Sequence, residues 1–331
     1  MIGAWGHGAA MLNHLAGGGA EHIELAALGM TSATETFDGW KQQHAWLRDV
    51  PVYDDYRSLL NKVEADFAVV STALPHLPAA ILDTLNAGLP LYTEKPIAAD
   101  EATLRELQRA ASGKQLFVLF TTGNHSHPAL RKIRELADAG TLGKIAIVNA
   151  RKSYPWADDR PAKFPVKYGG TLGWVGIHAL EFISAATGLD FRKVSAMESN
   201  VLSADHADCP DNVAVCLELS NGAHATLSLD YHRPRGSRTH GDDWIRVAGT
   251  TATVEANLSR NTFLLTGADG EQADTPMPRH ENWFDLIPQA LAGDERQAQR
   301  CHTLTNEAFR LSQVAIIAQQ AAISGCTMAI P

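Results

Sequence analysis

Short, almost wholly apolar runs alternate with helical patterns between residues 23 and 121, and this alternation limits the possible folds more than any other feature. The helical patterns between the runs include residues 78–87 and a segment capped by Asp100 that ends at Gly113. Strands that are apolar on both faces are typical of parallel sheets, and helices supply the crossovers. The expected strands are Ile23 to Leu28, Phe67 to Thr72, Leu91 to Thr93 and Leu116 to Thr121. The first part of the chain is therefore predicted to be a doubly wound α/β domain.

After residue 123 the pattern changes to strands that follow one another without helices. A helix over 129–139 and a strand over 145–150 lead to an irregular stretch over 153–168, after which Ser220-Asn221-Gly222 gives a hairpin signal. The later strands are expected at 212–219, 223–229, 244–248, 253–256 and 263–266. This part is predicted to be an α+β domain with a large, mainly antiparallel open sheet. A closing helix over 306–324 can pack back on the first domain.

Charge and composition exclude several classes of partner. The net charge of -9 argues against binding to nucleic acid or to an anionic membrane, so small molecules are the expected partners. No apolar run reaches the roughly 18 residues that a membrane helix needs. Four widely spaced cysteines and no secretory leader predict reduced thiols in the cytoplasm. The segment 205–209 has no second cluster at ligand spacing, so no metal site is expected.

The chain opens on a glycine-rich turn, Gly3-Ala4-Trp5-Gly6-His7-Gly8, which leads into an apolar-spaced helix. Such a turn offers backbone N–H groups and a helix dipole to a pyrophosphate. Trp5 stands where a dinucleotide fingerprint has its second glycine, and little strand precedes the turn. Either the first strand is only Met1 and Ile2, or residues are missing upstream.

An acidic residue is expected about 20 residues later, where it binds the ribose hydroxyls of a dinucleotide. The corresponding strand ends instead in Gly29-Met30-Thr31-Ser32. The hydroxyls of Thr31 and Ser32 either only turn the chain or meet the adenosine ribose or its 2′-phosphate. The choice between NAD and NADP is open at this point.

Two further segments carry candidate catalytic side chains. Thr93-Glu94-Lys95-Pro96 follows a buried strand, so Lys95 lies at the carboxyl edge of the sheet, where ligands bind, unless it forms a surface ion pair. His178 ends the glycine-rich segment 169–178, and its imidazole suits proton transfer near neutral pH. Taken alone, the pattern favours a buried histidine bonded to a backbone carbonyl group, and only the pairing with Lys95 makes His178 a candidate acid–base partner. His125 and His127 come next, because they start the second domain.

The glycine turn, Thr72, Glu94-Lys95-Pro96 and the segment 169–178 together resemble the glucose-fructose oxidoreductase, inositol dehydrogenase and MocA family, over nearly the whole chain. The resemblance implies a dinucleotide-binding Rossmann domain over 1–123 and a domain for substrate binding and oligomerisation over 124–331. It implies NAD or NADP as cofactor, Lys95 and His178 as the catalytic pair, and a Lys95-Pro96 bond that can be cis. The implied cofactor-binding residues are Gly3, Trp5, Gly6, His7, Gly8, Thr31, Ser32, Thr72, Leu74, His76, Glu94, Lys95 and Pro96.

Three departures from the family pattern indicate an unusual substrate pocket. Trp174 replaces a common aspartate four residues before His178, and His125 stands where an arginine is common. The strand-end pattern Thr-Pro-Asn-x-x-His is here Thr72-Ala73-Leu74-Pro75-His76-Leu77, with the histidine displaced. Aromatic and cationic residues before His178, among them Arg160 and Lys167, suit a polyol or sugar acid, although each of them taken singly fits a solvated loop equally well. The expected substrate-binding residues are His125, Tyr154, Trp156, Lys163, Tyr168, Trp174 and His178.

The leading hypothesis is an NAD- or NADP-dependent oxidoreductase that interconverts a hydroxyl and a carbonyl on a sugar, cyclitol or related polyol. His178 is expected to act as the general base, and Lys95 to stabilise charge on the same oxygen. One alternative is transient use of the cofactor in glycoside elimination or hydrolysis, and another is a non-catalytic regulatory protein that binds dinucleotide. A broad sheet with one face to cover favours a homodimer or homotetramer.

Overall fold

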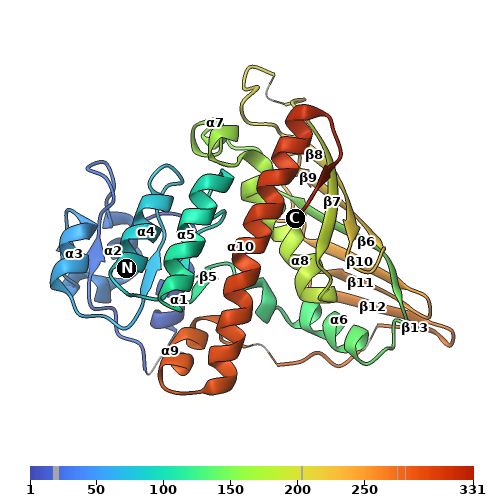
Figure 1. Cartoon of the computed structure of the whole chain (residues 1–331), viewed down its shortest axis with the longest axis horizontal. Helices are drawn as coiled ribbons and strands as arrows, with labels where there is room; N and C mark the ends of the chain where they lie inside the picture. The colour runs from blue at the N-terminus through green and yellow to red at the C-terminus, as the bar shows by residue number, and fades with distance from the viewer. Residues whose placement is uncertain (18–21, 203, 274, 280) are drawn as a thin grey trace. The chain divides into compact units, whose positions relative to one another are not determined.

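Two segments far apart in the sequence, Met1–Thr122 and Asn282–Ser312, form the first of two units in the computed structural model of the chain (Figure 1). The second unit comprises Gly123–Glu281 and Gln313–Pro331. The structure describes residues 1–17, 22–202, 204–273, 275–279 and 281–331.

The first unit contains a parallel sheet whose two halves meet at Ile2. β1 (Leu28–Gly29) pairs with β2 (Val52–Tyr53), and β4 (Leu91–Thr93) lies between β3 (Ala68–Val70) and β5 (Val118–Phe120), all in parallel. Ile2 forms parallel bridges to Gly29 on one side and to Val70 on the other. The order is therefore β2, β1, Ile2, β3, β4, β5, which is the doubly wound order of a Rossmann fold. The predicted fold class is confirmed.

Helices connect these strands. The side chain of Asp100 accepts a hydrogen bond from the backbone N–H of Thr103 at 2.9 Å and caps α5 (Glu101–Gly113), as its sequence position predicts. Pro78 lies in the first turn of α4, where its missing N–H costs nothing. The helices of this segment are α1 (Gly8–Ala16), α2 (Asp38–Gln43), η1 (Ala45–Asp49), α3 (Tyr56–Lys62), α4 (Leu77–Asn86) and α5 (Glu101–Gly113).

The expected strand from Ile23 to Leu28 is largely wrong, because only its last residue lies in β1. Its partner β2 has two residues and pairs with Leu28 and Gly29 alone. The segment 23–27 instead lines a cavity. An apolar run without a neighbouring strand at the right register does not form a ladder.

The segment from Asn282 completes the core of the first unit. Trp283, Phe284 and Ile287 are buried in the same cluster as Tyr92. The indole N–H of Trp283 donates to the carbonyl of Phe120 at 2.8 Å, and Thr305 Oγ1 accepts from the N–H of Val118 at 3.0 Å. The elements are η5 (Trp283–Asp285), α9 (Leu286–Leu291) and the first part of α10 (Glu295–Ser324).

Helix α10 begins earlier than the expected closing helix at 306–324. The Asp294 side chain accepts from the N–H of Gln297 at 3.1 Å and caps the helix there, a signal that the sequence prediction did not use. No helix in the described part of the chain is both long enough and apolar enough to cross a membrane.

The second unit contains a nine-stranded sheet, in the part of the chain that the structure describes, with the order β13-β12-β11-β10-β6-β9-β8-β7-β14. Only β6 and β9 pair in parallel, and every other described pair is antiparallel. The strands are β6 (Ile145–Ser153), β7 (Phe191–Ser199), β8 (Asn212–Leu219), β9 (His224–Asp230), β10 (Trp244–Gly249), β11 (Thr253–Asn257), β12 (Thr262–Gly267), β13 (Gly270–Gln272) and β14 (Met328–Ala329). The predicted large, mainly antiparallel sheet is confirmed.

Helix α8 (Ile177–Thr187) packs against β6 on one face of this sheet (Figure 1). Burial alternates along β8 and β9, so Val213, Val215 and Leu227 are buried while Thr226 and Ser228 are exposed. One face therefore belongs to the core and the other is open. The remaining helices are η2 (Asn124–Ser126), α6 (Pro128–Asp138), α7 (Arg160–Lys163), η3 (Val166–Tyr168) and the π-helix η4 (Leu172–Gly176).

Candidate active site

The glycine turn lies at the point where the strand order of the first unit reverses. Ile2 stands between β1 and β3, and the chain leaves it through Gly3, whose N–H donates to the carbonyl of Gly29 at 2.8 Å. The N–H of Trp5 donates to the carbonyl of Ser71 at 3.0 Å, and α1 begins at Gly8. In open α/β sheets a ligand crevice forms at this switch point, outside the carboxyl ends of the strands.

Glycine is required at three positions of the turn. A Cβ on Gly3 would lie 2.4 Å from the Ser71 carbonyl oxygen, and one on Gly8 would lie 2.6 Å from Ser71 Oγ. Gly6 is exposed at a φ of +64°, and a Cβ there would lie 2.4 Å from Glu94 Oε1. A glycine turn at a helix start, exposed at Gly6 and placed at the carboxyl edge of a parallel sheet, fits a dinucleotide pyrophosphate.

Glu94 is fully buried and ties the end of β4 to the turn. Its carboxylate accepts from the backbone N–H of His7, contacts His7 Nδ1 at 2.9 Å and accepts from Ser71 Oγ at 3.2 Å. Ser71 Oγ in turn accepts from the N–H of Gly8 at 2.8 Å. Burial alone would raise the pKa of Glu94, but His7 and Lys95 more than offset it and hold the pKa below its ordinary value.

Lys95 follows directly and is 1% exposed. The peptide bond between Lys95 and Pro96 is cis, which the family resemblance allows. A lysine buried to this degree is uncommon without a specific role or partner. Its catalytic role stays a prediction.

The end of β1 carries an acid that the sequence analysis missed. Glu35 folds back so that one carboxylate oxygen accepts from the N–H of Ala4 and the other from the N–H of Thr31, both at 2.7 Å. Thr31 Oγ1 lies 2.5 Å from Thr72 Oγ1. The predicted residues Thr31 and Thr72 are therefore brought together after the carboxyl ends of β1 and β3, with Glu35 beside the glycine turn. An acid four residues after Thr31 is the signal that could have identified it.

The other predicted cofactor residues lie at the edge of this group. Ser32 Oγ contacts Thr34 Oγ1 at 3.3 Å, an arrangement that stays within the turn. Leu74 is buried and His76 is exposed at the start of α4. Among the bonds that the structure describes for Leu74 and His76, none reaches the glycine turn.

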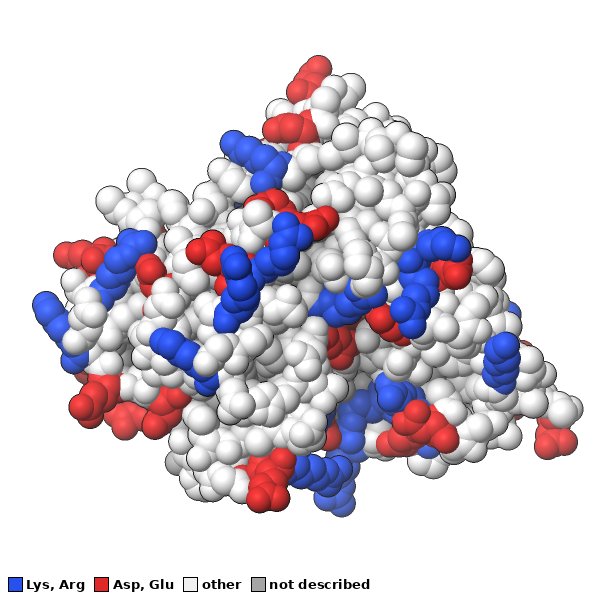
Figure 2. All heavy atoms as spheres, viewed as in Figure 1, with Lys and Arg blue, Asp and Glu red and all other residues white. Residues whose placement is uncertain are grey.

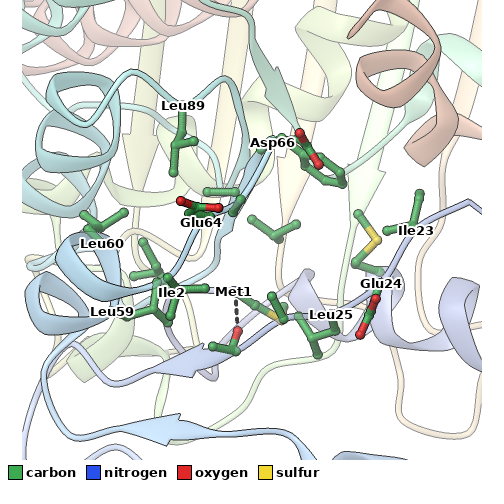
Figure 3. A pocket seen from close by; sticks show the side chains of 18 of the residues that line it. Met1, Ile2, Ile23, Glu24, Leu25, Leu59, Leu60, Glu64, Asp66 and Leu89 are labelled. Carbon is green, nitrogen blue, oxygen red and sulfur yellow. Dashed lines mark hydrogen bonds between the residues drawn. The ribbon is translucent and has the colours of Figure 1, made fainter. Parts of the chain in front are cut away.

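A cavity of about 450 Å³ in the first unit lies at the amino ends of the strands (Figure 3). Ile23, Leu25, Leu59 and Leu89 are among its lining residues, and the terminal ammonium of Met1 donates to the Ala27 carbonyl at 2.7 Å. Residues 23–27 and 63–67 precede β1 and β3, so the cavity faces the edge opposite the glycine turn. It is not part of the candidate site.

In the second unit, His178 lies in the first turn of α8, directly after the π-helix η4. π-Turns are rare and are frequent at functional sites. His178 is 4% exposed, and its Nδ1 lies 3.2 Å from Asn124 Nδ2. Asn124 Nδ2 also donates to Glu181 at 2.5 Å. Neither partner was predicted from the sequence, although the three-residue spacing of His178 and Glu181 puts them on one helix face.

A cluster of aromatic and cationic residues surrounds Tyr154. Lys152 Nζ lies 4.9 Å from the Tyr154 ring centroid and donates to Asp243 at 2.5 Å, and the His240 ring lies 5.1 Å from that of Tyr154. Burial alone would lower the pKa of Lys152, but Tyr154 and Asp243 raise it. Burial, together with the cations Arg160 and Lys152, lowers the pKa of His240.

The remaining predicted substrate residues have separate surroundings. Trp174 is buried and stacks on Phe164 with ring centroids 4.4 Å apart. The Trp156 ring lies 6.0 Å from that of Tyr231. Lys163 is exposed and pairs with Asp159 at 2.6 Å, Lys167 Nζ lies 4.9 Å from the Tyr168 ring, and His125 is half-buried in η2. Substrate binding by these residues stays a prediction.

Basic and acidic side chains are interspersed over the face seen in Figure 2. Within the described ranges, no group of three or more His, Cys, Asp or Glu side chains is placed to hold a metal ion.

Two family models match the chain. Residues 6–122 match the model described as oxidoreductase family, NAD-binding Rossmann fold, and residues 130–255 match the GFO/IDH/MocA C-terminal domain. A solved structure from Thermotoga maritima, assigned to the oxidoreductases, is 26% identical with a TM-score of 0.89, and the match covers 99% of this chain and 98% of that one.

Two named relatives are similar over part of their length. The trans-1,2-dihydrobenzene-1,2-diol dehydrogenase of Bos taurus is 28% identical over 56% of this chain and 55% of its own length. The D-xylose 1-dehydrogenase (NADP(+)) of Hypocrea jecorina is 22% identical over 77% of this chain and 64% of its own. The chain thus spans between about half and two thirds of these relatives.

Proposed function

Because the chain belongs to the GFO/IDH/MocA family of oxidoreductases, we propose that it is an NAD(P)-dependent oxidoreductase that interconverts a hydroxyl and a carbonyl on a sugar, cyclitol or related polyol. One observation carries the proposal. Glu94 accepts a hydrogen bond from the glycine turn, and the next residue, Lys95, is buried at the same edge of the sheet. The diol and xylose dehydrogenases among the relatives support a polyol as the substrate class.

In this proposal the chain's own residues bind the cofactor and act on the hydroxyl group of the substrate. A bound nicotinamide would supply the acceptor for a hydride from the carbinol carbon. The backbone N–H groups of the glycine turn would bind the pyrophosphate, and Thr31, Thr72 and Glu35 would bind the adenosine ribose. Lys95 and His178 act on the substrate hydroxyl.

Lys95→Met and His178→Leu test this assignment. Each should keep dinucleotide affinity within a few-fold and lower kcat/KM for a polyol by roughly 10² or more, the usual scale of lost acid–base assistance. The double variant should be little worse than the worse single one, since residues acting as a unit are not additive. Turnover is followed as NADH or NADPH formation across a polyol panel, and affinity by calorimetry.

Lys114→Met is the matched control, because Lys114 Nζ bonds backbone carbonyls of the first unit, including that of Asn86 at 2.6 Å. It should leave kcat/KM within a few-fold of wild type. Full activity of Lys95→Met would overturn the catalytic assignment. Substrate conversion without net NADH or NADPH would instead indicate that the cofactor is used transiently.

We further propose that NAD is preferred over NADP. The carboxylate of Glu35 beside Thr31 attracts ribose hydroxyls and repels a 2′-phosphate, and like charges a few ångströms apart cost on the order of 1 kcal/mol or more. Wild type should therefore bind NAD at least roughly tenfold more tightly than NADP. Glu35→Gln should narrow that ratio, mainly by strengthening NADP binding.

Calorimetry with both dinucleotides measures the ratio. Asp38→Asn removes the same charge three residues away, on α2, and should leave the ratio unchanged. An equal effect of the two substitutions would mean that net charge, not the position of Glu35, sets the preference.

The proposal also includes a cytoplasmic homodimer or homotetramer. The open sheet face supports it, since exposed Thr226 and Ser228 pair with Cys216 and Ala214 on β8, and Ala214 pairs in turn with Met197, which is 74% exposed. Small and apolar side chains on a flat face suit association with a second copy. Sedimentation should show a dimer or tetramer, and Thr226→Arg should dissociate it.

A further inference from the structure

The turn that opens the second unit fixes the position of Asn124. Gly123 has a φ of +61°, and its carbonyl accepts from both the N–H and the hydroxyl of Ser126, at 3.0 and 2.7 Å. The carbonyl of Asn124 accepts from the N–H of His127 at 2.9 Å, directly before α6 begins. These bonds hold the backbone of Asn124, so its side chain amide has a defined direction.

That amide bridges two buried side chains of α8. Asn124 Nδ2 lies 3.2 Å from Nδ1 of His178 and 2.5 Å from Oε2 of Glu181. The two partners are 4% and 1% exposed and lie one helical turn apart on the same face. An amide nitrogen carries two hydrogens, so it can donate to both partners at once.

The carboxylate of Glu181 determines which end of the amide faces His178. An ionised carboxylate only accepts hydrogen bonds, so it requires the NH2 group of Asn124 rather than its oxygen. The opposite orientation would set two acceptors against each other at 2.5 Å. The second N–H of the same group then points at His178 Nδ1, which must accept. A neutral imidazole that accepts at Nδ1 carries its proton on Nε2.

We propose that Asn124 is a positioning residue that fixes His178 as the Nε2–H tautomer, so that His178 offers the substrate oxygen a hydrogen-bond donor and not a base. This inference rests on the proposed function, in which His178 acts on the substrate hydroxyl. It reverses the role of general base that the sequence suggests for His178.

As a donor at Nε2, His178 does not take up the proton of the substrate hydroxyl. In oxidation the C–H hydrogen would leave with its electron pair to the nicotinamide, and the O–H proton would pass to solvent water. The Nε2–H of His178 donates to the oxygen while negative charge develops on it. In reduction water would return the proton, so atoms and charge balance in both directions.

Nitrogen-15 NMR of histidine-labelled protein tests the tautomer without any substrate. Two-bond couplings to the ring protons distinguish an Nε2–H imidazole from an Nδ1–H one, and comparison with His178→Leu identifies the signal among the 14 histidines. At about pH 8, where a free imidazole is neutral, wild type should show Nε2–H for His178. An Nδ1–H form or an imidazolium ion would overturn the inference.

Glu181→Gln tests the cause. A glutamine can donate to the Asn124 oxygen, so the amide is free to turn round and accept from Nδ1–H. A rise in the Nδ1–H form is expected in this variant, and an unchanged tautomer would show that Glu181 does not orient Asn124. Ser126→Ala is the matched control, since it removes a hydrogen bond of the same turn that does not reach His178. In this variant the tautomer of His178 should be the same as in wild type.

Kinetics separate a donor from a base. The amide of His178→Gln can donate a hydrogen bond but cannot take up a proton, whereas His178→Leu can do neither. If His178 is a donor, the glutamine variant should keep kcat/KM within roughly tenfold of wild type while the leucine variant loses roughly 10² or more. Equal losses in both variants would overturn the donor role.

The two proposals fail in different ways. A protein that turns over no polyol with either dinucleotide contradicts the proposed function, whatever the tautomer. A polyol oxidoreductase whose His178 carries its proton on Nδ1 retains that function and contradicts only the inference about Asn124.

Discussion

Glu94, beside the glycine turn of the first unit, is fully buried and yet has a lowered pKa, and these two properties conflict in most proteins. A carboxylate buried as deeply as that of Glu94 needs several donors to remain ionised, and it finds them in His7 and Ser71. The glycine at position 6 leaves the space that this carboxylate occupies. Glycine turn and buried acid are therefore one structural feature, and a change in either should affect the other.

The lowered pKa of Glu94 predicts a specific dependence of stability on pH. A carboxyl group whose pKa is lower in the folded protein than its ordinary value of 4.5 stabilises the fold above that pH, and the contribution is lost as the pH falls through the folded pKa. Wild type should therefore be more stable than Glu94→Gln near neutrality, and the difference should shrink below about pH 4.5. Urea denaturation at a series of pH values measures it.

Glu106→Gln, on the exposed side of α5, controls for the loss of one carboxylate. A difference between wild type and Glu94→Gln that stays constant down to about pH 3 would mean that the folded pKa of Glu94 is not the cause.

At the scale of elements, the hydroxyl of Tyr92 joins β4 to the segment from Asn282. It donates to the carbonyl of Trp283 at 3.0 Å and accepts from the N–H of Ile287 at 3.1 Å. The Tyr92 ring also meets that of Phe284 edge-on, with centroids 5.2 Å apart. Burial raises the pKa of Tyr92, so the hydroxyl remains protonated and keeps donating.

Tyr92→Phe should lower the free energy of unfolding by about 1–3 kcal/mol, because it leaves a buried N–H and a buried carbonyl without this partner. Tyr53→Phe, on the half-exposed strand β2, should cost less than about 0.5 kcal/mol. Equal losses in chemical denaturation would show that the Tyr92 hydroxyl does not bind the two segments together.

The sequence was informative where one local rule determines an element. Leu91 to Thr93 is a buried strand with the predicted bounds, and Asp100 caps α5, because apolar runs and capping residues act locally. The two candidate sites depend on contacts between residues that are far apart in the sequence. Glu35 reaches Ala4, and Asn124 reaches His178 and Glu181, across 31, 54 and 57 residues. No periodicity encodes such pairs, so the acid at the turn and the amide beside His178 were missed.

At the scale of the whole molecule, the first unit is not continuous in sequence. Its core includes Trp283, Phe284, Leu286 and Ile287 from the second segment. Residues 1–122 alone therefore expose the surface around Tyr92 and lose the donor to the Phe120 carbonyl. A Rossmann sheet without these contacts lacks part of its core.

A fragment of residues 1–122 should accordingly show no cooperative thermal transition. The same fragment joined by a flexible linker to residues 282–312 should regain one, and Trp283→Ala in the joined protein should lower its midpoint by several degrees or more. Calorimetry and circular dichroism measure both. Cooperative unfolding of residues 1–122 alone would show that the second segment is dispensable.

The nine-stranded sheet of the second unit also has a consequence for behaviour at high concentration. Its two outermost strands are among its shortest, with three residues in β13 and two in β14. A short edge offers few free N–H and C=O groups to a strand from another molecule. The sheet can therefore leave a broad face open for ordered pairing with a second copy, while its rims give little template for the endless edge-to-edge growth that leads to fibrils.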